Sequence, residues 1–330
     1  MAVLKASSTR TESSGFSSYA IPDATTARLA PYVSEGVELT YKNLNGNTLD
    51  LSLGLDSPIT EGSISFYMYW EETSTNNWDY NVFALYSNTG NILLRLYREI
   101  NSSVFTLYYA DSDATESSMS ASIPPTGLTR WDIEFKIAAD ASGYFKVYQN
   151  KTLVYSISGQ NNGKGASFDN IKWVRTGGGS GARRTMSAMM IADESTIPLD
   201  VCQQRPDADG AIFEWTGSYA DIDGPGTDAS SEASTAAADQ SFLVGFPDIP
   251  AGLAGGSIDF TQIVAVGDST SLKMDVLARS GGATYDEGQI SDSGRSVADV
   301  LKIPQDPNTL AAWTISGLNA AEFGIKSITP

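Results

Sequence analysis

The stretch WDIEFKIAADASGYFKVYQNKTLVYSISG, residues 131–159, decides the fold. Its apolar side chains first fall on every second position, at Ile133, Phe135 and Ile137, while Asp132 and Glu134 occupy the alternate positions. A period of two is typical of a strand with one face in a core and the other in water. The two carboxylates are therefore expected on the solvated side of the strand.

The second part of the same stretch predicts a β-hairpin. Alternation resumes at Phe145 and Val147, breaks at residues 149–151 and returns from Leu153 onward. Two alternating runs separated by a short polar break are typical of antiparallel strands joined by a tight turn. The hairpin is expected to feed a larger antiparallel sheet.

Short strands are also expected on the N-terminal side of this hairpin. In residues 63–70, Ile64, Phe66 and Met68 share one face. Two strands are predicted around Asn45-Gly46-Asn47, and further strands are predicted at 82–87, 91–99 and 103–111. Many short strands with scarcely any helical period indicate a β-sandwich.

The chain divides into three parts by composition. Residues 1–35 form a Ser/Thr-rich N-terminal arm, either flexible or ordered against a neighbouring subunit, with no apolar run long enough for a signal peptide or membrane span. Residues 36–205 are expected to form a β-sandwich, with Met186, Met189 and Met190 filling its core from the last strand. Residues 206–330 are expected to form a smaller acidic β-sandwich, in which Ser316 caps a short helix between two strands.

Charge and residue usage exclude several classes of function. The net charge is −18, and residues 206–330 hold 18 acidic and 5 basic residues, hence −13 of that total. Such a surface repels phosphate, so no nucleic-acid partner is expected. The chain has no histidine and a single cysteine, which excludes Ser-His-Asp and Cys-His catalysis as well as histidine or multi-cysteine metal sites.

The order of elements in residues 37–195 resembles the concanavalin A-like, laminin G-like jelly roll. The similarity lies in the strands at 63–70 and 90–97, Trp131 at the start of a strand, the hairpin YQNKTLVYS at 148–156 and the closing MIADES at 190–195. In that family the hairpin usually has glycine after asparagine. Lys151 stands there instead, which leaves the turn geometry open, and no calcium or sugar motif of the family is matched.

A second resemblance covers residues 40–330. The segments SAMMIADEST (187–196), EWTGSYADIDG (214–224), ARSGGATYD (278–286) and AAWTISGLNAAEFGIKS (311–327) look like virion proteins of tailed bacteriophages. The resemblance implies a non-enzymatic structural protein on the particle exterior, as a capsid decoration or tail protein. It also implies assembly in the bacterial host cytoplasm, contacts with capsid, neck or tail subunits, and a homo-oligomer.

A carbohydrate- or host-receptor-binding tail or fibre module is the alternative. Aromatic rings stack on sugar faces while acid and amide groups fix the hydroxyls, and Trp78, Asp79 and Tyr80 lie together in a polar loop. These three residues are the predicted ligand-binding site. Three strand tyrosines are further candidates, although cross-strand packing explains them equally: Tyr67, Tyr69 and Tyr108.

Enzymatic and metal-binding roles are weaker alternatives. A glycoside hydrolase or lyase on the same fold would need a pair of carboxylates that no motif marks, so the chain is not expected to be an enzyme. Asp-x-Asp spacings at 111/113, 207/209 and 221/223 could hold Ca²⁺, but the twelve-residue calcium loop is absent and solvated acidic turns explain them better. No metal or cofactor is expected.

Overall fold

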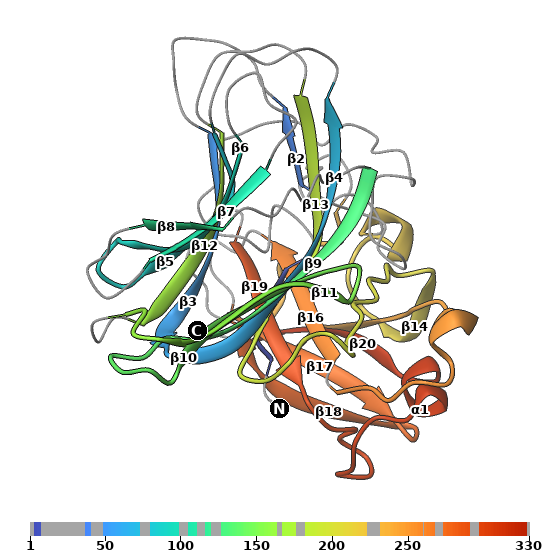
Figure 1. Ribbon diagram of the computed structural model, residues 1–330. Helices are drawn as coiled ribbons and strands as arrows, with labels where there is room; N and C mark the ends of the chain where they lie inside the picture. Colours follow the sequence, from blue (N-terminus) through green and yellow to red (C-terminus); the bar gives the residue numbers. More distant parts are fainter. Residues whose placement is uncertain are drawn as a thin grey trace. The chain divides into compact units, whose positions relative to one another are not determined.

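The structure is a computed structural model of residues 1–330 (Figure 1). In the first part of the chain, two antiparallel sheets pack face to face. The structure describes residues 3–7, 37–40, 49–72, 80–98, 105–110, 116–119, 127–163, 167–175, 182–222, 232–259, 261–267, 273–290 and 297–328. The chain separates into two units, Met1–Cys202 and Gln203–Pro330. None of the helices described has the length and apolar character needed to cross a membrane.

Sheet A of the first unit has the strand order β1-β13-β4-β9-β10-β11, and β2 also pairs with β13. All its pairings are antiparallel. Its strands are β1 (Val3–Ser7), β2 (Val37–Thr40), β4 (Glu61–Glu72), β9 (Gly127–Lys136), β10 (Gly143–Gln149), β11 (Thr152–Gln160) and β13 (Ala182–Ala192).

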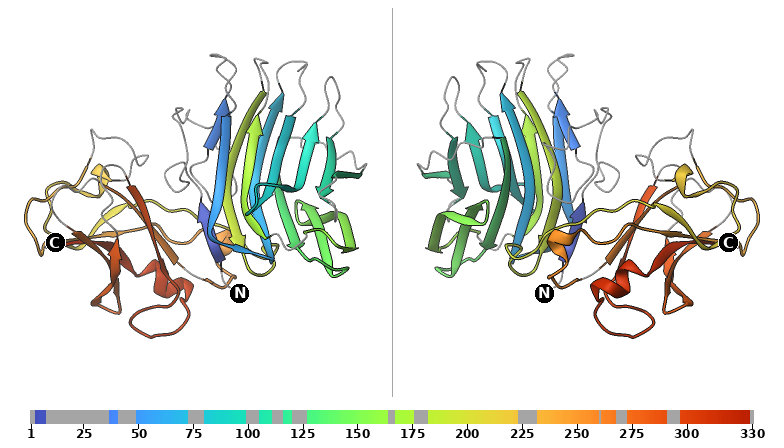
Figure 2. Two further views of the ribbon diagram at one scale, coloured as in Figure 1. Left: turned by 90° about the vertical axis from the view of Figure 1, so that its left-hand side faces the viewer. Right: turned by 90° about the vertical axis from the view of Figure 1, so that its right-hand side faces the viewer.

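Sheet B has the order β3-β12-β5-β6-β7-β8 and is also antiparallel. Its strands are β3 (Leu49–Ile59), β5 (Tyr80–Ser87), β6 (Ile92–Arg98), β7 (Phe105–Ala110), β8 (Glu116–Met119) and β12 (Phe168–Arg175). The long strands of the first unit lie along nearly the same axis in Figure 2, with neighbours antiparallel. The two sheets form the β-sandwich expected from the alternation of apolar residues, and the jelly roll expected from the resemblance to the concanavalin A-like family is confirmed.

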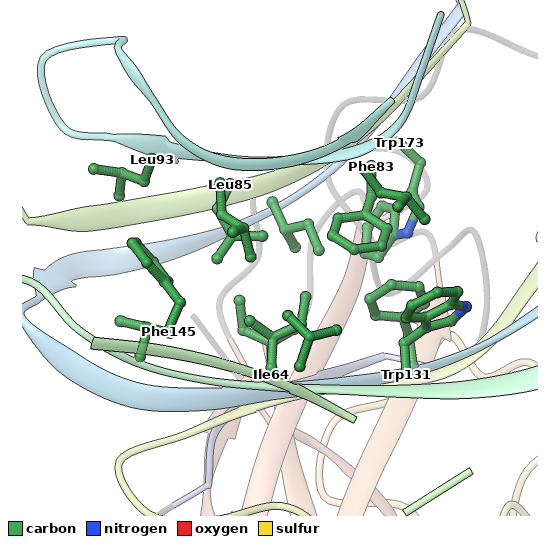
Figure 3. Close-up of a cluster of buried hydrophobic side chains, with 14 of the residues drawn as sticks. Ile64, Phe83, Leu85, Leu93, Trp131, Phe145 and Trp173 are labelled. Carbon is green, nitrogen blue, oxygen red and sulfur yellow. The ribbon is translucent and has the colours of Figure 1, made fainter. Parts of the chain in front are cut away.

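The core of the first unit lies between the two sheets (Figure 3). Phe66 of β4 meets two rings of sheet B edge to face, with centroid distances of 5.4 Å to Phe83 and 5.1 Å to Trp173. Trp131 of β9 lies 5.6 Å from Phe83 in the same way. All four rings are fully buried, and burial of such side chains supplies most of the stabilisation of a sandwich.

Several expectations about the first unit are confirmed at the level of single residues. Ile64, Phe66 and Met68 point into the core, as do Ile133, Phe135 and Ile137. The three methionines of β13, Met186, Met189 and Met190, are also buried, and the core-filling role is confirmed for Met186 and Met189, which belong to the cluster between the sheets.

The hairpin between β10 and β11 turns over Asn150 and Lys151, whose φ angles are 50° and 63°. Two successive positive φ angles are those of a type I′ turn, which matches the twist of the strands. Asn150 also ties the turn to β9, because its Oδ1 accepts from the Arg130 backbone N–H at 3.0 Å and its own N–H donates to the Arg130 carbonyl at 2.9 Å.

Other expectations need correction. The two strands predicted in residues 37–55 do not pair, because β2 joins β13 in sheet A and β3 joins β12 in sheet B. Residues 3–7 of the predicted N-terminal arm form β1, paired with β13, while residues 8–36 lie outside the described part of the chain. Alternation alone identifies strands, but it does not say to which sheet a strand goes.

The second unit contains a smaller antiparallel sheet, sheet C, with the order β14-β15-β20-β17-β18, and a separate pair of β16 and β19. The strands are β14 (Ala208–Phe213), β15 (Ser241–Gly245), β16 (Thr261–Gly267), β17 (Lys273–Ser280), β18 (Ala283–Ile290), β19 (Val297–Ile303) and β20 (Glu322–Ile328). Short helical turns are η2 (Tyr219–Asp221), η3 (Ala251–Leu253) and α1 (Ile315–Asn319).

The core of the second unit gathers around Trp313 and Phe323, whose ring centroids are 5.9 Å apart. Trp313 Nε1 donates to the Ile303 carbonyl at 3.1 Å, so the indole N–H is satisfied although buried. The N-cap of α1 is Thr314, whose hydroxyl accepts from Gly317 N–H at 2.9 Å, and not Ser316 as expected. The whole chain is thus all-β, a jelly roll followed by a smaller β-sandwich.

Candidate ligand-binding face

The face of sheet B that points away from the core carries tyrosines and cations. On β6, Leu94 and Leu96 are buried in the core while Arg95 and Tyr97 alternate with them and are half-buried. The strand register extends this face to both neighbours, because Arg95 lies opposite Tyr108 of β7 and Ala84 of β5. We call the resulting set the tyrosine–cation face: Asn81, Tyr86, Arg95, Tyr97, Tyr108 and Lys172.

Arg95 is the centre of this face. Its guanidinium carbon lies 4.8 Å from the ring centroid of Tyr97 and 4.8 Å from that of Tyr108. The two rings meet edge to face, with centroids 5.8 Å apart and an interplanar angle of 85°. Arg95 Nη1 also donates to Asn81 Oδ1 at 3.2 Å. These contacts hold a cation of fixed charge in one place on a rigid sheet.

A second cation–aromatic pair lies beside the first. Lys172 of β12 places its Nζ 4.8 Å from the ring centroid of Tyr86 on β5. Lys172, Ala84 and Arg95 are successive Cα partners across β12, β5 and β6, so that only the methyl group of Ala84 lies between the two cations in this row. The face therefore repeats the same chemistry, a cation on a tyrosine ring, at two neighbouring points.

The corresponding face of sheet A is partly covered by the strap, residues 193–200, which follows β13. Arg130 of β9 is 3% exposed and Asp132 is fully buried. The Arg130 guanidinium donates to Asp132 Oδ2 from Nε at 2.9 Å, and to the carbonyls of Thr196 and Leu199 at 2.7 Å each. The expectation that Asp132 is solvated is therefore wrong, because the strap turns this part of the strand surface into an interior.

Two lysines described on the remainder of the outward face of sheet A, Lys136 and Lys146, lie close to carboxylates. Lys146 lies 5.1 Å from the ring centroid of Tyr144, yet its Nζ is also 3.5 Å from Glu134 Oε2. Tyr148 donates to Glu134 Oε2 at 2.9 Å, and burial together with this carboxylate raises the pKa of Tyr148 to about 12. Lys146 and Glu134 on this face are therefore paired within the protein.

The structure describes only part of the binding site that the sequence predicts. Trp78 and Asp79 lie outside the described residues, and Tyr80 begins β5 opposite Arg98. Of the three further candidates, Tyr108 lies on the tyrosine–cation face. Tyr67 and Tyr69 belong to sheet A, where the Tyr67 ring centroid lies 5.7 Å from the Arg130 guanidinium.

Four residues of the tyrosine–cation face were not identified as candidates from the sequence: Arg95, Tyr97, Tyr86 and Lys172. The signal for the first two was present, because Arg-Leu-Tyr at 95–97 alternates with buried leucines. Lys172 could not be associated with them, since it comes from a strand far along the chain that pairs with β5.

Two carboxylates of the Asp-x-Asp spacings considered as calcium sites accept hydrogen bonds from nearby backbone N–H groups. Asp209 Oδ1 accepts from Tyr219 N–H at 2.7 Å, and Asp221 Oδ2 accepts from Ser218 N–H at 2.8 Å. Within the described ranges, no group of three or more Cys, Asp or Glu residues is arranged to hold a metal ion. Asp111, Asp113 and Asp223 lie outside those ranges.

Comparison with known proteins gives similarities of fold only. No family model matches the chain, and the search of curated proteins finds no match. An endo-β-1,4-glucuronan lyase from the fungus Trichoderma reesei is 11% identical, with a TM-score of 0.40 over 52% of this chain and 90% of that one. A mutant of the alginate lyase Aly36B in complex with alginate tetrasaccharide is 12% identical, with a TM-score of 0.35 over 48% and 80% of the chains. The binding domain of Paraclostridial Mosquitocidal Protein 1 is 10% identical, with a TM-score of 0.37 over 50% and 41%.

These findings contradict the expected function. The similar solved structures include polysaccharide lyases, so the prediction of a non-enzymatic structural component of a phage particle is wrong and is not carried further. Lyases and a binding domain both occur among them, which leaves the expected lack of enzymatic activity without confirmation. At these identities no residue, substrate or activity is transferred to this chain.

Proposed function

We propose that this protein binds carbohydrate through the tyrosine–cation face of sheet B. The observation that carries the proposal is the fixed group of three tyrosine rings and two cations on one sheet surface. Sugar rings have apolar C–H faces that pack on aromatic rings, and hydroxyl groups that exchange hydrogen bonds with charged and amide side chains. The face offers both kinds of partner within a few residues of each other.

The scaffold supports such a role because the face is rigid. Every residue of the tyrosine–cation face lies on a strand whose opposite side is core, and Arg95 is further restrained by two rings and by Asn81. A site that is already ordered loses little conformational entropy when a ligand binds.

Asn170, next to Lys172 on β12, adds a polar group that a ligand could satisfy. Its Nδ2 donates to Asp169 Oδ2 at 2.7 Å, while its Oδ1 is buried and has no hydrogen-bond partner among the described residues. A buried acceptor without a partner costs free energy, and a hydroxyl of a bound sugar would remove that cost.

Affinity electrophoresis tests the proposal. The intact chain and the Tyr108→Ala variant are run through gels that contain neutral or charged soluble polysaccharides, and their retardation is compared. We expect at least one polymer to retard the intact chain, and Tyr108→Ala to weaken that binding about tenfold, which corresponds to about 1.4 kcal/mol. Tyr144→Ala is the matched control, because Tyr144 packs against a cation, Lys146, as Tyr108 packs against Arg95, but it lies on sheet A. Absence of retardation by every polymer, or equal losses in the two variants, would refute the proposal.

The proposal is one of binding without cleavage. After prolonged incubation the bound polymer should be recovered at its original length in size-exclusion chromatography. Shortened chains that disappear with the Tyr108→Ala variant would instead identify the same face as an active site.

A further inference from the structure

We propose that two copies of this chain associate through one end of the second unit, with Leu310 of each copy packed against the other copy. The contact surface consists of the turn between β17 and β18, residues 280–284, and the loop between β19 and α1, residues 304–312. We call these two segments together the uncharged tip. This inference concerns a different unit from the tyrosine–cation face and does not rest on carbohydrate binding.

Leu310 departs from the usual preferences of folding in two ways. Its side chain is 75% exposed, more than that of any other large apolar residue in the described ranges. Its φ is 56°, in the left-handed region that glycine and asparagine adopt far more readily than leucine. Neither property stabilises a single copy of the chain. An exposed apolar side chain on a strained backbone is explained if a partner covers it.

The loop that carries Leu310 is held in one conformation. Leu310 N–H donates to the Asp306 carbonyl at 2.8 Å, and Asp306 N–H donates to the Ala311 carbonyl at 2.9 Å. The Asp306 carboxylate accepts from Asn308 N–H at 3.0 Å and from the Ser280 hydroxyl. Leu310 is thus presented on an ordered support, which reduces the entropy that is lost when a partner binds.

The loop is also fixed to the turn of the β17–β18 hairpin. Gly281 and Gly282 have φ angles of 58° and 85°, the positive values of a type I′ turn. The side chain of Asn308 lies so close to Gly281 that no Cβ atom would fit there. Tyr285 Oη donates to Asn308 Oδ1 at 3.2 Å. The two segments therefore form one continuous surface.

The uncharged tip exposes no charged side chain. Its fourteen residues include one charged residue, Asp306, which is 7% exposed and satisfied within the loop. Lys302 and Asp286 lie two residues beyond the two segments in the sequence, and both are exposed. An uncharged centre with charged residues at its margin is the usual composition of a protein–protein interface.

The absence of charge favours an identical partner. In a two-fold symmetric interface, residues near the axis face the same residues of the other copy, so a charge placed there would meet its like. Two copies that each carry a net charge of −18 repel each other over most of their surfaces, and the uncharged tip is where this repulsion is weakest. A basic partner protein would be recognised through carboxylates, which the tip does not expose.

The size of the uncharged tip predicts a weak dimer. A stable interface takes about 20 to 30 residues from each side, roughly twice the number that the tip offers. We therefore expect a dissociation constant between about 10⁻⁶ and 10⁻⁴ M, with Leu310 as the apolar anchor.

Sedimentation velocity of the full chain, from about 1 to 300 µM, measures this dimer. Leu310→Asn removes the apolar side chain and suits the left-handed backbone, so it should weaken dimerisation by at least about tenfold. Urea unfolding at the lowest concentration should show that this variant is at least as stable as the intact chain. Leu310→Met keeps an apolar side chain of similar volume and should dimerise within about threefold of the intact chain.

A control variant and salt check the location and the nature of the contact. Leu153 is the other large apolar side chain that is exposed in the described ranges, and it lies on β11 of the first unit. Leu153→Asn should therefore leave dimerisation unchanged. A rise in NaCl from about 0.05 to 0.5 M should strengthen the dimer, because salt screens the repulsion between two acidic copies.

The possible results separate clearly. A chain that stays monomeric at every concentration would overturn the proposal. A dimer that persists in Leu310→Asn, or that Leu153→Asn dissociates equally, would place the contact elsewhere and overturn it as well. Dissociation by salt would show that opposite charges hold the copies together, which contradicts an uncharged contact. None of these results depends on whether the chain binds a polysaccharide.

Discussion

At the scale of single residues, Arg130 shows how a charged side chain can be part of an interior. Its guanidinium donates to Asp132, to the carbonyls of Thr196 and Leu199, and to Asp200 Oδ1 at 2.8 Å. These acceptors use all five N–H groups, so the charge is compensated although the side chain is almost inaccessible. Two residues of β9 thereby attach the strap: Arg130, and Asp132, whose Oδ1 also accepts from the Thr196 hydroxyl at 3.2 Å.

Removal of this guanidinium should destabilise the first unit strongly. Arg130→Ala leaves the Asp132 carboxylate buried without its cation, and loss of one member of a buried pair costs about 3–5 kcal/mol. Urea unfolding followed by fluorescence measures the loss. Arg279→Ala is the control, because the pair of Arg279 and Glu322 in the second unit is partly exposed and should contribute about 1 kcal/mol or less. Similar losses in both variants would contradict this account.

Tyr148 should make stability depend on pH in the alkaline range. Its pKa is raised from 10 to about 12 by burial and by the hydrogen bond to Glu134, so between these values the folded chain keeps a proton that the unfolded chain has lost. The resulting stabilisation is complete below pH 10 and is lost as the pH rises toward 12.

The measurement for Tyr148 is the free energy of unfolding at a series of pH values from 9 to about 12, the range set by the shifted pKa. We expect Tyr148→Phe to show a shallower fall than the intact chain, since other tyrosines such as Tyr155 still contribute. Parallel curves for the two proteins would show that Tyr148 does not retain its proton.

At the scale of elements, the hairpin turn between β10 and β11 contains backbone strain that one substitution can remove. Lys151 adopts φ = 63°, a conformation that glycine adopts without penalty. Lys151→Gly should therefore raise the free energy of unfolding by up to about 1 kcal/mol, reduced by loss of the exposed ion pair to Asp200 at 3.3 Å. Lys151→Ala loses the same ion pair but keeps the strain, so it should be the less stable of the two variants in urea unfolding. The reverse order would be inconsistent with a strained turn.

The same elements show what could be predicted from sequence. Alternation identified the strands and core residues of the first unit, because period two depends only on the pleat of each strand. Pairing depends on distant residues, and so the partners of β2 and β3 were not foreseen. Asp132 was misplaced for a related reason, since the strap that covers it begins about 60 residues later. At the candidate site, Tyr108 was identified from the sequence. Lys172 was not, because it is placed on the same face only by the pairing of β12 with β5.

At the scale of the whole molecule, the two units differ in charge. Residues 203–330 contain 18 acidic and 6 basic residues, a net −12, while residues 1–202 contain 21 and 15, a net −6. Repulsion among like charges destabilises a folded state, and salt screens it. The second unit should therefore gain more stability from salt than the first.

Hydrogen exchange on the full chain tests this difference. Between about 0.01 M and 1 M NaCl, a range over which the Debye length falls about tenfold, amides of β17 and β20 should become protected by a larger factor than those of β4 and β9. Equal gains in the two units would show that net charge does not limit the stability of the second.

One property of strand β11 affects how this protein behaves in concentrated solution. Among the described strands it has a single neighbour, β10, and none of its nine residues is charged or proline. Charged residues usually protect an edge strand from pairing with strands of other molecules. Here they are absent, and the side chain of Leu153 on β11 is apolar and 49% exposed. Self-association on storage should begin along this edge, and a lysine in place of Ser156 would act as a gatekeeper against it.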